Sequence, residues 1–239
     1  MIMRKYIHGI PVDLRTKQEI MAQIAEWLLF PKQPRQIITL NALMWLSAAQ
    51  NHQFQQIIRE ADLITLDGRG ILMALKKNGH RILEQVTGIE LTRELLSWCS
   101  VHQCPVYFYG GSPAAAQRLR LQLPSSWPGL VIQGIQDGFG GPAGQMEIME
   151  EIQRHAPGLL IVGLGSPAQE FFLARLLPKL KYTVGIGAGG TLDVLAGLKR
   201  EAPPLIREHN LEWLYRMFQD PVKFKRLPDL FRFWNSCLR

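Results

Sequence analysis

The strongest local signal of the fold class is the stretch Leu159-Leu160-Ile161-Val162-Gly163-Leu164-Gly165-Ser166-Pro167-Ala168-Gln169-Glu170. Four apolar residues followed by two glycines and a Ser-Pro pair are typical of a buried strand that leads directly into a helix. We expect Ser166 to be the N-cap, Pro167 the first helical residue and Glu170 part of the first turn. Helix-start chemistry leaves Gln169 unexplained, so its amide is a candidate ligand contact.

The same strand-then-helix pattern recurs along most of the chain. Expected strands cover 36–40, 62–66, 105–109, 130–133, 159–162 and 183–186, with a short strand and turn at 5–13. Expected helices cover 18–30, 89–102, 112–122, 144–155 and 168–180, and one begins near 42. This alternation predicts an α/β fold with a Rossmann-like, mainly parallel sheet and helices on both faces.

The alternation stops after Gly197, and Pro203 and Pro204 break the chain before two or three short amphipathic helices. We therefore expect an α/β catalytic domain over 1–198 and a basic helical C-terminal appendage over 199–239. The chain has a net charge of +7, and its last 41 residues hold nine Lys or Arg against five Asp or Glu, a net of +4. Such a surface attracts nucleic acid, anionic lipid or phosphorylated small molecules, although a solvated helical face explains it equally well.

The sequence lacks the motifs of several common kinds of segment and site. No apolar run approaches the length of a membrane span, and the N-terminus lacks the features of a secretory signal, so a cytoplasmic protein is expected. The histidines are scattered, the three cysteines have no metal-ligand spacing, and no Asp-x-Asp is present. Walker, Gly-x-Ser-x-Gly and RNA-binding signatures are also missing. The sequence predicts neither a metal site nor a nucleic-acid partner.

Parallel sheets bind ligands beyond the carboxyl ends of their strands. The segments that follow the expected strands are rich in Gly, Asp, Asn and Ser. They supply these candidate substrate-binding residues: Thr39, Asn41, Gly68, Gly110, Gly111, Ser112, Asp137, Gly163, Gly165, Pro167, Gln169, Glu170, Gly189 and Gly190.

Asp67 directly follows an apolar strand and is a candidate general base. A tight turn or a cap on the next helix would also explain an aspartate here. Gly110-Gly111-Ser112 could bring a helix N-terminus to a diphosphate, or simply cap that helix. The glycines at 185–190 contain G-x-G without the full dinucleotide pattern, which disfavours a nicotinamide cofactor.

Several of these motifs, together with 210–216 and 220–226, resemble the bacterial WecG/TagA/CpsF glycosyltransferases, glycosyltransferase family 26. The matching motifs are Thr65-Leu66-Asp67-Gly68 and the 163–170 stretch. The resemblance implies an inverting, metal-independent enzyme without a cofactor. Such an enzyme moves an N-acetylhexosamine-type sugar from a UDP-sugar to a polyprenyl-diphosphate-linked sugar during cell-surface polysaccharide synthesis. It also implies a peripheral location at the inner face of the plasma membrane, and the sequence leaves a homo-oligomer open.

The resemblance also implies residue roles. Asp67 would be the catalytic base, and Thr39, Asn41 and Gln169 would orient the sugars. Arg216, Lys223 and Arg226 would bind the donor phosphates. The family has arginine at the position of Lys223, and its arginine near 201 falls on Glu201 here.

A second hypothesis comes from another class of protein. The chain could be a non-catalytic nucleotide-sensing module whose basic C-terminus holds anionic lipid.

Overall fold

The computed structural model describes residues 4–7, 9–80 and 84–201 and the single positions 203, 206 and 215. Its centre is a six-stranded sheet in the order β4-β3-β8-β7-β5-β6, and every pairing between neighbouring strands is parallel. The strands are β3 (Arg35–Leu40), β4 (Leu63–Leu66), β5 (Val106–Gly110), β6 (Ile132–Gln136), β7 (Leu159–Gly163) and β8 (Val184–Gly187). The predicted α/β class with a parallel sheet is confirmed.

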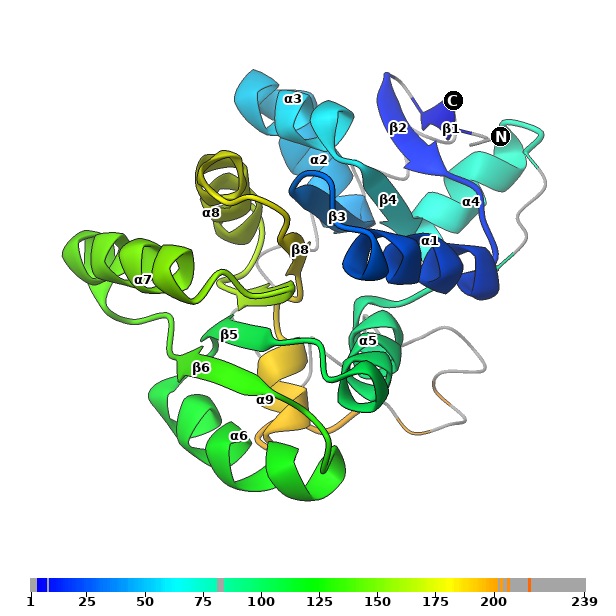
Figure 1. Cartoon of the computed structure of the whole chain (residues 1–239). Helices are drawn as coiled ribbons and strands as arrows, with labels where there is room; N and C mark the ends of the chain where they lie inside the picture. Colours follow the sequence, from blue (N-terminus) through cyan, green and yellow to red (C-terminus); the bar gives the residue numbers. More distant parts are fainter. Residues whose placement is uncertain are drawn as a thin grey trace.

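Helices cover both faces of this sheet (Figure 1). One face packs against α1 (Lys17–Leu29), α5 (Gly88–His102), α6 (Pro113–Ser126) and α9 (Thr191–Leu195). The other face packs against α2 (Ala42–Gln50), α3 (His52–Glu60), α4 (Arg69–Lys77), α7 (Gly141–His155), α8 (Ala168–Leu176) and the short 3-10 helix η1 (Leu177–Lys179). Because both faces are covered, the strands are apolar nearly throughout, which explains why they are recognisable in the sequence.

The N-terminal segment is a β-hairpin rather than the expected single strand and turn. Strands β1 (Arg4–Ile7) and β2 (Ile10–Asp13) pair antiparallel beside the β4 edge of the sheet. Arg4 donates to both carboxylate oxygens of Asp13, at 2.8 and 2.9 Å, and Asp13 Oδ2 accepts from the amide of Ile64 at 2.8 Å. The buried Asp13 therefore fastens the hairpin to the sheet.

Two further differences come from local and tertiary contacts. The helix expected near residue 42 is divided into α2 and α3, because Asn51 ends the first and caps the second by accepting from the Phe54 amide at 3.0 Å. Strand β6 begins at Ile132 rather than 130, because Leu130 is still held in a turn by Trp127.

Across the ranges that the structure describes, no helix is both long enough and apolar enough to cross a membrane.

Candidate functional site

The C-terminal ends of the six parallel strands form one side of the sheet, called here the carboxyl edge. The candidate residues that follow all six strands lie together at this carboxyl edge. Parallel strands end at the same edge, so segments far apart in the sequence become neighbours there. Strands β8 and β7 occupy the centre of the sheet, with β3 and β4 on one side and β5 and β6 on the other. The segment after β8 therefore lies at the middle of this edge.

Asp67 stands at the end of β4, where its amide donates to Leu40 O of β3 at 2.9 Å. The residue is half-buried, and Gly68 rather than Asp67 is the N-cap of α4. The backbone of Asp67 thus completes the β3–β4 ladder, and the residue lies one position ahead of the cap. This is the position that the sequence predicted for a carboxylate at the edge of the sheet.

Thr39 and Asn41 flank the end of β3 and both have structural partners. Thr39 is buried, with Oγ1 3.5 Å from Gly187 O, and it packs under Gly88 at the start of α5. Asn41 Oδ1 accepts from the Met44 amide at 3.0 Å and caps α2, as the sequence predicted. The cap uses only the oxygen of the Asn41 amide, so its nitrogen can still donate to a ligand at the edge.

The glycines that resembled phosphate loops bring backbones together. Gly110 has φ of 121°, and a Cβ there would lie 2.5 Å from backbone atoms of Gly163. The Gly111 amide donates to Gly163 O at 2.9 Å, and the Gly138 amide donates to Gly111 O at 3.1 Å. Through these glycines, the end of β5 directly contacts both the end of β7 and the turn after β6.

Ser112 and Asp137 also have local roles. Ser112 Oγ accepts from the Ala115 amide at 3.1 Å and caps α6, which is the simpler of its two interpretations. Asp137 Oδ1 accepts from the Phe139 amide at 2.9 Å and stabilises a turn.

The start of α8 differs from the sequence prediction. The expectation of Ser166 as N-cap and Pro167 as first helical residue is wrong: α8 begins at Ala168, and Pro167 is its N-cap without a side-chain cap. Gly165, with φ of 76°, turns the chain ahead of the helix, and its carbonyl accepts from the Gln169 amide at 3.0 Å. Ser166 Oγ is left buried without a hydrogen-bond partner among the described residues.

Gln169 and Glu170 form a buried polar pair at the centre of the edge. Gln169 is 3% exposed and Glu170 1% exposed. Gln169 Nε2 donates to Glu170 Oε1 at 2.7 Å, while Gln169 Oε1 accepts from the Gly189 amide at 2.8 Å. Burial raises the pKa of Glu170 to about 7, although the hydrogen bond from Gln169 offsets part of that rise. The predicted ligand contact Gln169 thus has two protein partners.

The proposed phosphate ligands Arg216, Lys223 and Arg226 lie outside the described residues. The chain that leads toward them is anchored near α5 and α9. Lys199 Nζ lies 2.6 Å from Asp193 Oδ2, and Glu201 forms an ion pair with Arg93 of α5.

Metal ligands do not converge in the described part of the chain, where no group of three or more His, Cys, Asp or Glu side chains could hold a metal ion.

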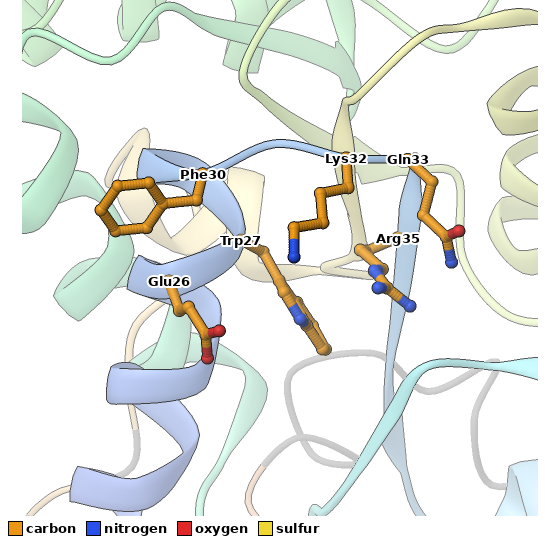
Figure 2. Close-up of a pocket in the computed structure, with 6 residues that line it drawn as sticks. All are labelled: Glu26, Trp27, Phe30, Lys32, Gln33 and Arg35. Carbon is orange, nitrogen blue, oxygen red and sulfur yellow. The ribbon is translucent and has the colours of Figure 1, made fainter.

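A pocket of about 320 Å³ lies at the opposite edge of the sheet (Figure 2). Its lining comes from the end of α1, the connection to β3 and the first residue of β3: Glu26, Trp27, Phe30, Lys32, Gln33 and Arg35. Arg35 is already engaged there, with its guanidinium 5.2 Å from the Trp27 ring centroid and 2.6 Å from Asp62 Oδ1. Since β3 begins at this end, the pocket is separated from Asp67 by the length of the strands.

Comparisons with known proteins identify the family of this chain. The sequence profile of the "Glycosyl transferase WecG/TagA/CpsF family" matches residues 5–239. Two relatives carry the name N-acetylglucosaminyldiphosphoundecaprenol N-acetyl-beta-D-mannosaminyltransferase. The one from Bacillus spizizenii is 29% identical over 203 residues, covering 85% of this chain and 78% of its own length. The one from Bacillus subtilis is 25% identical over 233 residues, covering 98% of this chain and 90% of its own length.

The match takes in the sheet, the carboxyl edge and the basic C-terminal segment together, and it favours an enzyme over a non-catalytic nucleotide-sensing module. This chain belongs to the WecG/TagA/CpsF family of glycosyl transferases.

Proposed function

We propose that this enzyme transfers an N-acetylmannosamine-type sugar from a UDP-sugar to N-acetylglucosaminyl-diphosphoundecaprenol. The observation that carries the proposal is the match over 98% of the chain to a relative named for that acceptor and that sugar. The parallel sheet supports it, because the carboxyl edge gathers a half-buried carboxylate, capped helices and buried amide groups in one place.

The reaction is an inverting displacement at the anomeric carbon. Asp67 takes the proton from the acceptor hydroxyl as its oxygen forms the new bond to the sugar. The bond to the diphosphate breaks on the opposite face, and UDP leaves with the electron pair. The half-buried position of Asp67 at the end of β4 suits this role, because a carboxylate there can meet a hydroxyl at the edge.

Charge on the departing UDP is stabilised by cations in the proposed mechanism. Arg216, Lys223 and Arg226 fill this role without a metal ion, since guanidinium and ammonium groups bind diphosphate directly. Asn41 orients a sugar through its amide nitrogen. The lipid tail of the acceptor keeps the enzyme at the inner face of the plasma membrane, with the basic segment 199–239 toward the anionic surface.

An assay of UDP release tests the proposal. Purified enzyme is given UDP-N-acetylmannosamine or UDP-N-acetylglucosamine, with and without a short-chain prenyl-diphosphate N-acetylglucosamine acceptor, in EDTA. We expect acceptor-dependent release that EDTA leaves intact. Loss of release in EDTA would overturn metal independence, and silence with both donors would overturn the choice of donor.

Variants separate chemistry from binding. Asp67→Asn should lower kcat by at least 100-fold, the range expected for a lost general base, while UDP affinity stays within about threefold. Glu60→Gln removes an exposed carboxylate on α3 and serves as the matched control, with unchanged kcat. Wild-type turnover in Asp67→Asn would exclude Asp67 as the base.

A further inference from the structure

We propose that Glu170 is a positioning residue that fixes the side-chain amide of Gln169, so that Gln169 can hold the loop 188–190 at the centre of the carboxyl edge. The structural part of this inference stands on hydrogen bonds in the described chain. Its consequence for turnover rests on the proposed function.

The direction of each hydrogen bond fixes the orientation of the Gln169 amide. The Gly189 amide can only donate, so Gln169 must present Oε1 to it, at 2.8 Å. Gln169 Nε2 must then face the other way, where Glu170 Oε1 accepts at 2.7 Å. Without an acceptor at position 170, this buried nitrogen would lose a partner, and the amide would be drawn away from Gly189.

The neighbouring strands are shaped around this pair. A Cβ at Gly187 of β8 would lie 2.5 Å from Gln169 Nε2 and 2.9 Å from Glu170 Oε1, so the lack of a side chain lets both lie against the strand. From β3, Gln36 Nε2 donates to Glu170 O at 3.3 Å. The carboxyl therefore packs against β8, and Gln36 of β3 holds the backbone carbonyl of the same residue.

The loop that Gln169 holds connects β8 to α9 and also contacts β7. The Ala188 amide donates to Val162 O of β7 at 2.7 Å, and Gly190 is the N-cap of α9. Gly189 O lies 3.0 Å from the place of a Cβ on Gly163. A shift of Gly189 would therefore disturb the end of β7 as well as the start of α9, beside the candidate substrate-binding residues Gly163 and Gly190.

Burying the carboxyl of Glu170 is energetically costly. Glu170 Oε2 and Ser166 Oγ are both buried without a hydrogen-bond partner in the described part of the chain, and burial raises the pKa of the carboxyl to about 7. The groups found around the carboxyl are neutral: Gln169 and Ser166 from its own segment and Gly187 from β8. Raised pKa values of this kind concentrate at functional sites.

Two substitutions at position 170 distinguish the effect of losing a hydrogen-bond acceptor from the effect of changing side-chain volume. Glu170→Gln keeps an oxygen that can accept from Gln169 Nε2, whereas Glu170→Leu keeps similar volume and removes the acceptor. Hydrogen exchange is measured by mass spectrometry on the full chain, in the peptide that covers residues 184–192. We expect exchange at Gly189 to be at least tenfold faster in Glu170→Leu and within threefold of wild type in Glu170→Gln.

Two results would overturn the inference: wild-type exchange in Glu170→Leu, or equally fast exchange in both variants. The peptide covering β5 reports whether the variant is folded. If Glu170→Leu does not fold, Gln169→Leu removes the acceptor of the Gly189 amide directly. Slow exchange at Gly189 in that variant would equally overturn the inference that Gln169 holds the loop.

Turnover gives a second, separate readout. In an active wild-type enzyme, Glu170→Leu should lower kcat at least tenfold and Glu170→Gln should restore it to within threefold. Unchanged kcat in Glu170→Leu would refute the role in turnover. An inactive wild type would instead refute the proposed function, and the exchange experiment would still decide the structural part.

Discussion

Replacing Glu170 by glutamine should make the stability of the protein less sensitive to pH between pH 5 and pH 8. Burial raises the pKa of this carboxyl from 4.5 to about 7 in the native state. Between these values the native state binds a proton that the unfolded chain has released, so the wild type loses stability as the pH rises. At about 1.36 kcal/mol per pKa unit, the full loss is about 3 kcal/mol, and most of it falls between pH 5 and pH 8.

Urea denaturation of both proteins at the two pH values measures this effect. The free energy of unfolding of Glu170→Gln minus that of wild type should be about 2–3 kcal/mol larger at pH 8 than at pH 5. All other titrating groups are shared, so they cancel in this difference. Glu150→Gln, which removes an exposed carboxylate on α7, should follow the wild type at both values. A change below about 0.5 kcal/mol for Glu170→Gln would refute the burial of an ionisable carboxyl at this position.

Two other substitutions test how the edge and the hairpin are built. Gly110→Ala should lower the free energy of unfolding by about 3 kcal/mol or more in urea denaturation, because its Cβ would meet the Gly163 backbone at 2.5 Å and φ is 121°. Gly144→Ala in α7, with nothing within 4 Å, should stabilise slightly instead, and equal effects would contradict the close approach. Arg4→Ala should cost about 2–4 kcal/mol, because it leaves the buried Asp13 carboxylate without its bidentate partner. A cost below about 1 kcal/mol would show that the pair does not fasten the hairpin.

The fold class could be predicted because its signals are local. Each buried strand is a short apolar run, and each run ends in glycine, asparagine or aspartate. Those patterns are sufficient to predict that Asp67, Asn41 and the glycine segments share one edge of the sheet. The hairpin could not be predicted because it depends on Arg4 and Asp13, whose distant partners, Ala61 O and the Ile64 amide, lie 57 and 51 residues further along the chain and leave no local pattern.

The environment of Glu170 could not be predicted from helix-start chemistry. A glutamate three or four residues into a helix is normally explained by the helix dipole, and that explanation places it in solvent. A signal was nevertheless present in α8. Gln169 is spaced from Phe172, Leu173 and Leu176 at i+3, i+4 and i+7, which is the buried stripe of a helix. A polar residue in such a stripe predicts a buried polar contact rather than a surface ligand.

The hydrogen bonds at the carboxyl edge limit how a diphosphate can be recognised there. The amides of Gly111, Gly138 and Gly189 already donate to Gly163 O, Gly111 O and Gln169 Oε1. A backbone amide has a single proton to donate, so these three glycines do not form the ring of free amides that phosphate loops use. The proposed mechanism instead requires side-chain cations to meet the charge of the donor. This requirement gives the basic segment 199–239 a chemical reason to belong to the same site as Asp67.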